Sequence, residues 1–280
     1  MMSWRWHFKC RSIYPYQHLQ PHYEKLVGFI ILYMEQAAAK ADIIHQLQKE
    51  VLSLQGFKAA CGNQRLQTGL GVIEKAFPYE RFPTGTIHEL LSYAPEHAAA
   101  TNGFLSALAG RFLQAGGHCL WIGRKRTVFP PALACFGIAP EQIIFIDVAR
   151  EKEALWAYEE ALKCEALAVV VGEWSELSFA QSRRLQLAVE ESQVTGFIHR
   201  YSPRTENTTA CVSRWKISPL ASSIEAGMPG VGFPCWHVAL SKVRNGKPGA
   251  WDIEWSENTF KQLTSQQTTT PQIISIRQTG

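Results

Sequence analysis

Short apolar runs alternate with longer amphipathic segments over residues 80–200. The apolar runs have the length of buried strands, and they fall at 86–91, 119–122, 143–146, 167–171 and 196–199. The segments between them have a helical period and predict helices at 101–115, 130–135, 151–163 and 178–192. Ser178 lies three residues before Gln181, which is the spacing of a capping box at a helix start. Strands separated by helices predict right-handed crossovers and an α/β fold with a mainly parallel, twisted sheet flanked by helices.

The pattern changes after residue 208. Thr209 to Ile217 predicts a strand, and the Gly/Pro-rich segment from Ser218 to Pro234 predicts a loop. Apolar and polar residues then alternate on both sides of Asn245-Gly246, a dipeptide typical of a tight hairpin turn. We therefore expect C-terminal antiparallel strands at the end of a folded domain over 80–256. The Thr/Gln/Ser-rich residues 257–280 predict a flexible tail.

The N-terminal third is less regular. Four apolar residues spaced three or four apart predict a helical stripe within 34–56: Ile44, Leu47, Val51 and Leu54. Such a stripe packs onto its own domain or docks onto a partner, and the pattern favours neither. Residues 57–79 predict a linker. We interpret residues 1–33 as upstream sequence read in frame before a start at Met34, with a genuine flexible extension as the alternative.

Composition narrows the class of protein. The chain has 280 residues, 46% of them hydrophobic, which is enough for one α/β domain with a buried core. Its net charge of +4 permits contact with nucleic acid but does not imply it. The seven cysteines form no C-x-x-C pair, which predicts reduced thiols in a cytoplasmic protein. The histidines form no metal-binding pattern, so we expect no metal and no cofactor.

A phosphate-binding loop is expected between the strand at 86–91 and the next helix, but its residues are missing. A loop of the pattern G-x-x-x-x-G-K-[ST] binds phosphates through backbone N–H groups, which glycines expose, and through the Lys ammonium. Here Ala94 and Ala99 occupy the two Gly positions and Ala100 the Lys position, so only Thr101 remains. Without those glycines and that cation, we do not expect tight binding of a triphosphate.

The same region resembles RecA. Ala94-Pro95-Glu96 stands where the RecA loop begins Gly-Pro-Glu. The run Cys119 to Lys125 is similar to the RecA strand that ends in its catalytic Glu, and Lys125 occupies that position. Leu167 to Glu173 resembles the Walker B strand, with Gly172 at the metal-binding Asp position. Glu173 is one residue further, and strand alternation is expected to point it away from the metal. The resemblance implies a RecA-like core that has lost its catalytic chemistry, so the protein is not expected to be an enzyme.

Further runs resemble the ImuA family, the RecA-like accessory proteins of bacterial error-prone repair cassettes. They are Phe82–Gly85, Leu120–Gly123, Phe129–Leu133, Ala154–Leu162, Ser182–Glu190 and Val243–Gly249. The resemblance implies a non-catalytic adaptor in SOS-induced mutagenic translesion synthesis, cytoplasmic and at the nucleoid when active. Its implied partners are an ImuB-like Y-family polymerase, an error-prone C-family polymerase and RecA, with no membrane contact.

Two other hypotheses remain open. A SulA-like inhibitor of cell division, acting on FtsZ, also has a RecA-like fold without a Walker loop. The strand 167–172 and the helix around 185–188 fit either family, whereas the C-terminal hairpin favours the ImuA family. A weak ATPase that uses Thr101 and Glu173 is the third hypothesis.

Cationic residues gather in two places. Arg124, Lys125 and Arg126 follow the carboxyl end of a strand, where open parallel sheets bind ligands, and they predict a contact to DNA or to an acidic partner. A solvated loop explains them nearly as well. A second set predicts a basic strip with weak DNA contact: Arg214, Lys216, Lys242, Arg244 and Lys247. We expect Arg183 and Arg184 to pair with Glu190 and Glu191 instead.

Overall fold

The computed structural model describes residues 46–47, 68–222 and 230–263. The chain divides into two compact units, Met1–Ala59 and Ala60–Gly280. In the first unit the described residues are Gln46 and Leu47, which are helical. The sequence predictions for residues 1–33, Ile44, Val51 and Leu54 lie outside the described residues. All that follows concerns the second unit.

The described part of this unit contains one sheet, three α-helices and four short 3₁₀ helices. The strands are β1 (Ile87–Ser92), β2 (His118–Gly123), β3 (Ile143–Asp147), β4 (Leu167–Trp174), β5 (Thr195–Tyr201), β6 (Ser213–Leu220), β7 (Cys235–Val243), β8 (Gly249–Ser256) and β9 (Thr259–Gln262). The α-helices are α2 (Pro95–Leu113), α3 (Glu151–Leu162) and α4 (Phe179–Ser192). The 3₁₀ helices are η1 (Gly71–Ala76), η2 (Pro78–Glu80), η3 (Pro130–Phe136) and η4 (Pro140–Gln142).

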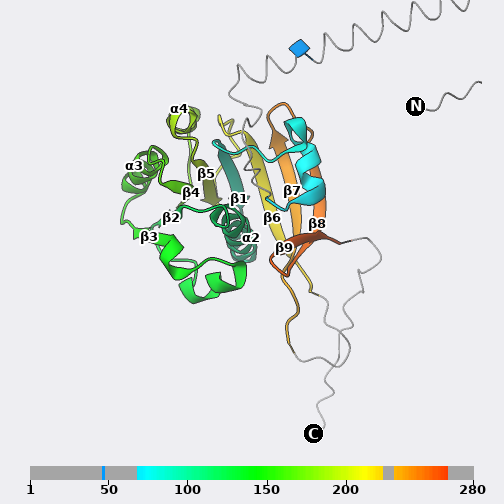
Figure 1. The fold of residues 1–280 in the computed structure, drawn as a ribbon. Helices are drawn as coiled ribbons and strands as arrows, with labels where there is room; N and C mark the ends of the chain where they lie inside the picture. The colour runs from blue at the N-terminus through cyan, green and yellow to red at the C-terminus, as the bar shows by residue number, and fades with distance from the viewer. Residues whose placement is uncertain (1–45, 48–67, 223–229, 264–280) are drawn as a thin grey trace, which may run out of the picture. The chain divides into compact units, whose positions relative to one another are not determined.

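The strand order is β3-β2-β4-β5-β1-β6-β7-β8-β9 (Figure 1). Neighbouring strands from β3 to β6 run parallel, whereas β7, β8 and β9 are added antiparallel. This confirms the predicted mainly parallel sheet with a C-terminal hairpin. The five predicted core strands correspond to β1–β5. Because the parallel strands share one direction, their carboxyl ends lie at one edge of the sheet, where the site described below is found.

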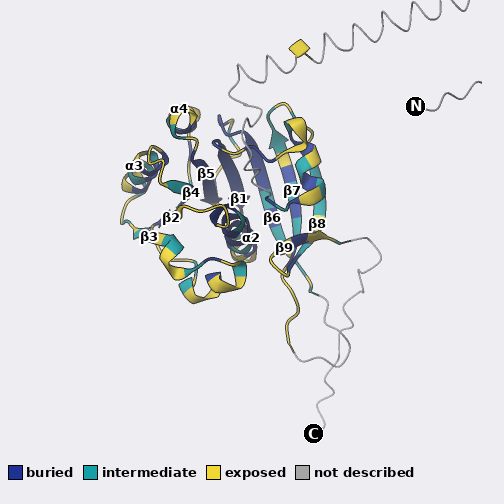
Figure 2. Ribbon diagram, in the orientation of Figure 1, coloured by how far each residue is buried: buried dark blue, intermediate teal, exposed yellow. Residues whose placement is uncertain are grey.

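Each face of the sheet contributes to a separate apolar core. Val171, Phe197 and Trp215 point to the face covered by α2, together with the aromatic residues of the C-terminal strands. Val170 and Ile198 point to the opposite face, which α3 and α4 cover. Figure 2 shows β1 and β5 buried on both faces, while α3 and α4 expose their outer sides. Burial on both faces explains why the central strands β2 and β4 are nearly continuous apolar runs in the sequence.

The helix α4 begins as its sequence predicts. Ser178 is its N-cap residue: the Gln181 N–H donates to Ser178 Oγ at 3.2 Å, and Gln181 Oε1 accepts from the Ser178 N–H at 2.8 Å. On its surface Arg183 pairs with Glu190 at 3.8 Å, as expected. Arg184 instead pairs with Glu159 of α3 at 2.6 Å, so this ion pair joins the two helices.

Four segments differ from the sequence predictions. Leu70, Ile73 and Phe77 are buried in the core, so residues 70–77 belong to the domain rather than to a linker over 57–79. The predicted helix at 130–135 is the 3₁₀ helix η3. The predicted strand Thr209–Ile217 is observed as Ser213–Leu220. Part of the predicted tail 257–280 forms β9, because Phe260 packs against the core with Trp255, at a centroid distance of 4.8 Å.

Candidate interaction site at the carboxyl edge of the sheet

Residues 95–101 form the first turns of α2 and not a loop. Ala94 is the N-cap residue, and its carbonyl accepts a hydrogen bond from the Ala98 N–H at 3.0 Å. Pro95 suits the first helical position, because its fixed φ is already helical, and alanines 98–100 have the highest helix propensity. The expectation that the helix begins at residue 101 is therefore wrong. Residues 92–101 are all described and none has a positive φ, so their backbone forms no phosphate-wrapping nest.

The first turn of α2 is also a poor anion site. Glu96 places a carboxylate there, and Pro95 has no N–H to donate. The N–H groups of a helix start normally attract phosphates, and both features weaken that attraction.

Thr101 is not available to a bound metal or nucleotide. Its side chain is fully buried, and its Oγ1 lies 2.9 Å from Ser92 Oγ. Ser92 Oγ in turn lies 2.9 Å from Nε2 of the buried His199. Burial lowers the pKa of His199 to about 4, so the imidazole is neutral at pH 7. Thr101 thus belongs to a buried polar relay that holds α2 against β1 and β5.

A cavity of about 600 Å³ lies between the start of α2 and the carboxyl ends of the neighbouring strands. Pro95, Ala98 and Ala99 supply an apolar wall from α2. The remaining lining includes Asn102, Arg124, Lys125, Thr127, Glu151, Glu173, Trp174, Ser175, His199 and Tyr201. The structure therefore brings together the first turns of α2, the Arg124-Lys125 segment and Glu173. This is expected for residues at one edge of a parallel sheet.

Glu173 points into this cavity, and the expectation that it points away is wrong. Along β4, Val171 faces the core beneath α2, so Glu173 faces the same side. Its Oε1 accepts hydrogen bonds from Trp121 Nε1 at 2.7 Å and from Thr127 Oγ1 at 2.9 Å. Burial is the main cause that raises the pKa of Glu173, and the two hydrogen bonds oppose it.

Gly172 faces the other side of β4, where a side chain does not fit. A Cβ atom there would lie 2.2 Å from the Trp174 ring and 2.7 Å from the Tyr158 ring. These two rings pack edge to face, with centroids 5.1 Å apart. Close packing between β4 and α3 therefore explains this glycine, and an Asp at this position would point away from the cavity.

The three cations after β2 have different environments. Arg126 pairs with Asp147 at 2.7 Å and lies over the Phe145 ring, 4.8 Å from its centroid. Arg124 Nε donates to the carbonyl of Ala149 at 3.3 Å. Lys125 is exposed and lines the cavity. Lys125 is therefore available for a charge contact with a partner. Arg124 is available only in part, because its Nε already donates to Ala149.

Arg214 and Lys216 form internal ion pairs. Arg214 is nearly buried, and its Nε donates to Glu89 Oε2 at 2.8 Å. Lys216 Nζ lies 2.5 Å from a carboxylate oxygen of Glu206. Both are therefore committed to contacts within the domain.

Lys242 and Arg244 donate to backbone carbonyls. Lys242 Nζ lies 2.6 Å from the carbonyl oxygen of Thr209, and a guanidinium nitrogen of Arg244 lies 2.5 Å from that of Ala210. Burial lowers the pKa of both side chains. Only Lys247 of the five is exposed. The interpretation of these residues as one basic strip is therefore corrected, because four of them hold the domain together.

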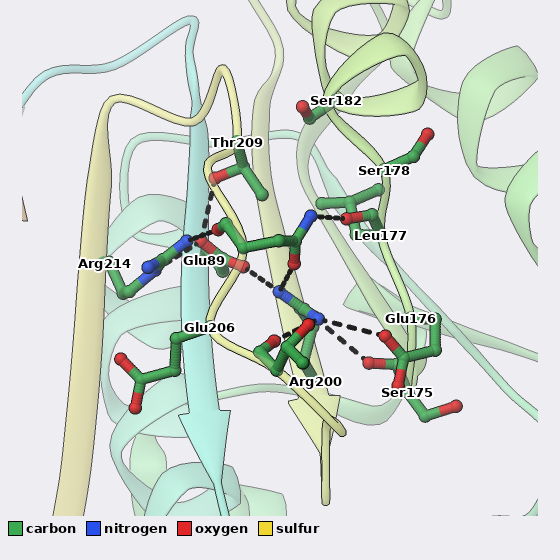
Figure 3. A network of polar contacts seen from close by, with 12 residues as sticks. Glu89, Ser175, Glu176, Leu177, Ser178, Ser182, Arg200, Glu206, Thr209 and Arg214 are labelled. Carbon is green, nitrogen blue, oxygen red and sulfur yellow. Dashed lines mark hydrogen bonds and ion pairs between the residues drawn. The ribbon is translucent and has the colours of Figure 1, made fainter.

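A buried ionic network was missed at the sequence level (Figure 3). Glu89 Oε1 accepts from Arg200 Nη1 at 2.6 Å, and Glu89 Oε2 accepts from Arg214 and from Thr209 Oγ1 at 2.9 Å. The side chains of Glu89 and Arg200 are 0% exposed. Arg200 also donates to Asn207 Oδ1 at 3.1 Å, which ties the segment before β6 to the sheet. The available signal was Glu89 inside the apolar run 86–91 and Arg200 directly after the run 196–199.

The remaining predictions are tested only in part. Leu47 is helical and 54% exposed. Among the described cysteines, Cys119, Cys211 and Cys235 are buried, whereas Cys135 and Cys164 are exposed. Within the same residues no group of His, Cys, Asp or Glu could hold a metal ion. None of the helices described is long and apolar enough to cross a membrane.

The strand order, the crossover helices and the cavity at the carboxyl edge define a RecA-like α/β protein in which residues 95–101 are helical. Protein ImuA of Caulobacter vibrioides, from strains NA1000/CB15N and ATCC 19089/CB 15, is 31% identical to this chain over 204 residues. The alignment covers 69% of this chain and 84% of the relative. The chain therefore belongs to the ImuA family. No family model matches the chain.

Proposed function

We propose that the protein is a non-catalytic RecA-like adaptor in the DNA-damage-induced mutagenic response. Its membership of the ImuA family supports a role in error-prone repair. The observation that carries the non-catalytic part is the helical conformation of residues 95–101, which removes the backbone donors that a triphosphate needs. The proposed partners are an ImuB-like Y-family polymerase, an error-prone C-family polymerase and RecA.

The geometry supports binding rather than turnover. Thr101 is fully buried, and Lys125 stands where RecA is expected to carry its catalytic Glu. The cavity at the same edge nevertheless persists, at about 600 Å³. A RecA-like core that keeps its edge cavity but lacks a phosphate nest is suited to contact other proteins through that edge.

Partner capture tests the adaptor role. The purified chain is immobilised and offered the ImuB-like polymerase and RecA of its own organism, with FtsZ as the competing target. We expect retention of the ImuB-like polymerase and of RecA but not of FtsZ. Selective retention of FtsZ would instead establish the SulA-like alternative.

Nucleotide binding tests the non-catalytic part. In calorimetry with ATP and Mg²⁺, we expect no saturable heat in the micromolar range and no phosphate release above the buffer rate. Magnesium-dependent micromolar binding, with hydrolysis that is lost in Glu173→Gln, would overturn this part of the proposal. A switch or motor function would then replace the adaptor.

A further inference from the structure

The carboxylate of Glu173 is the most unusual group in the cavity. It lies at the end of β4, and both of its hydrogen-bond donors, the Trp121 indole and the Thr127 hydroxyl, are neutral. The negative charge of the Asp147 carboxylate raises the pKa of Glu173 further. Glu173 is partly buried, and a carboxylate that loses hydration is destabilised unless a cation or several donors compensate for it. The cavity therefore favours a positively charged guest.

Asn102 provides a second, independent acceptor. Its Nδ2 donates to Thr127 Oγ1 at 3.0 Å, and Thr127 donates to Glu173, so the three side chains form one relay. Oδ1 of Asn102 is buried and has no hydrogen-bond partner among the described residues. A buried acceptor without a donor destabilises the site, because it has lost its hydration without gaining a hydrogen bond. Asn102 and Glu173 both line the cavity, so a guest with several N–H groups brings donors to the place where both acceptors lie.

The walls of the cavity suit an extended cationic side chain. Pro95, Ala98 and Ala99 line one side with apolar surface, against which a methylene stem can pack. His199 does not repel a cation at pH 7, because burial lowers its pKa to about 4. The carboxylate of Glu151 also lines the cavity, held by the Ser175 hydroxyl at 2.8 Å.

Two cations at the opening add selectivity. Arg124 and Lys125 are exposed there and disfavour a free polycation. They favour a cationic side chain that is flanked by carboxylates, which can pair with them while the cation enters the cavity.

We propose that this cavity binds the guanidinium group of an arginine that a partner protein presents next to acidic residues. A planar guanidinium has five N–H donors, so it can serve the Glu173 carboxylate and the Asn102 amide oxygen at once, which a lysine ammonium does less well. The identity of the presenting protein rests on the proposed adaptor function, whereas the binding of guanidinium by the cavity does not.

Calorimetric titration of the full chain tests the cavity directly. The probes are agmatine, a free guanidinium compound, and a blocked Asp-Arg-Asp peptide, with the same peptide carrying citrulline as the uncharged control. We expect the arginine peptide to bind at least tenfold more tightly than both agmatine and the citrulline peptide. Equal affinity for the arginine and citrulline peptides, or no saturable binding of the arginine peptide, would overturn the proposal.

Matched variants locate the binding. Glu173→Gln keeps the shape and the two accepted hydrogen bonds but removes the charge, and we expect at least tenfold weaker peptide binding. Glu165→Gln removes an equal charge from an exposed position at the amino end of β4, and we expect affinity within twofold of the unaltered chain. Equal loss in both variants, or in neither, contradicts the assignment. The citrulline comparison in the unaltered chain decides the matter if Glu173→Gln does not fold.

Partner capture separates this proposal from the adaptor role. If Glu173→Gln loses the ImuB-like polymerase or RecA while Glu165→Gln retains it, the cavity is part of that interface. If Glu173→Gln retains every partner, the proposal fails and the adaptor role stands. If the unaltered chain captures no partner, the adaptor role fails, and the peptide titration still decides whether the cavity binds guanidinium.

Discussion

Glu89 is a buried carboxylate that two arginines from neighbouring strands share. The β1–β5 and β1–β6 pairings bring Arg200 and Arg214 to its two oxygens, at 2.6 and 2.8 Å. Such a network adds little net stability compared with apolar side chains, but its partial loss leaves uncompensated buried charge. The sequence predicted Arg214 as a DNA contact because the pairing partner of a cation cannot be read from its own strand.

We expect Glu89→Gln to lower the free energy of unfolding by about 3–5 kcal/mol, because the nearly buried Arg214 then lacks a counter-charge and Arg200 keeps only the half-exposed Glu176, at 3.5 Å. Urea unfolding followed by circular dichroism measures the effect. Glu206→Gln is the control: it removes one partner of the half-exposed Lys216 pair and should cost less than about 1 kcal/mol. Equal losses of unfolding free energy in the two variants would show that the buried network stabilises the fold no more than the half-exposed pair does.

Buried histidines give the protein a defined response to acid. His88 stacks on Phe82 with ring centroids 4.4 Å apart, and burial lowers its pKa to about 3. The pKa of His199 falls to about 4 for the same reason. In the unfolded chain both titrate near 6.5, so between these values the unfolded state binds more protons and stability falls as pH falls.

We expect the free energy of unfolding to decrease by about 1.4 kcal/mol per pH unit for each histidine between pH 6 and pH 4.5, or about 3 kcal/mol per unit for both. Urea titrations at successive pH values measure this slope. His88→Gln should remove about half of it while leaving the contribution of His199. A slope that is the same with and without His88 would contradict the burial argument.

At the scale of secondary-structure elements, strands were predicted better than the start of α2. The apolar runs of β1–β5 needed only their own composition, and their observed bounds agree with prediction to within a few residues. The start of α2 was misplaced because a motif comparison suggested a loop where Pro95 and three alanines favour a helix. Local helix propensity therefore predicts the start of α2 better than the motif comparison does.

Two glycine substitutions test whether residues 94–99 form the start of a helix. Ala99→Gly should lower the free energy of unfolding by about 1 kcal/mol, the cost of glycine inside an exposed helix. Ala94→Gly should be neutral or slightly stabilising, because glycine is a better N-cap residue than alanine. Thermal or urea unfolding measures both, and a stabilising effect of Ala99→Gly would indicate that this segment is a loop.

At the scale of the whole molecule, the described cations of the C-terminal strands do not form one basic surface. The cations of β6 and β7 are paired with Glu89 or Glu206 or bound to backbone carbonyls. Those that remain exposed include Lys125 at the cavity and Lys247 after the β7 strand. The cations that were predicted to form a basic strip therefore offer few contacts to DNA phosphates.

We expect the logarithm of any DNA association constant to fall with the logarithm of salt concentration with a slope no steeper than about −3. Fluorescence anisotropy with a labelled duplex measures this slope. Lys125→Gln should make it shallower by about 1, while Lys242→Gln should leave it unchanged. A slope of about −5 or steeper would restore the basic-strip hypothesis.

The candidate site was predicted in its position but not in its contacts. Parallel strands guarantee that Ala99, Lys125 and Glu173 meet at one edge, so their proximity followed from the order of elements. The predicted direction of the Glu173 side chain was wrong. The prediction came from its one-residue offset in the motif comparison, whereas Val171, two residues earlier in β4, faces the core beneath α2 and so places Glu173 on the same side. Its partner Thr127 lies in a loop and carried no signal.

The sequence by itself determined the α/β class, the parallel core strands, the C-terminal hairpin and the alanines at positions 94, 99 and 100. These depend on local periodicity and residue type, which a single chain displays directly. Only the tertiary structure decided which charges are neutralised, which face Glu173 occupies and why Gly172 has no side chain. Those properties depend on contacts between strands and helices far apart in the chain, and burial there changes the energy of a charge more than its own sequence context does.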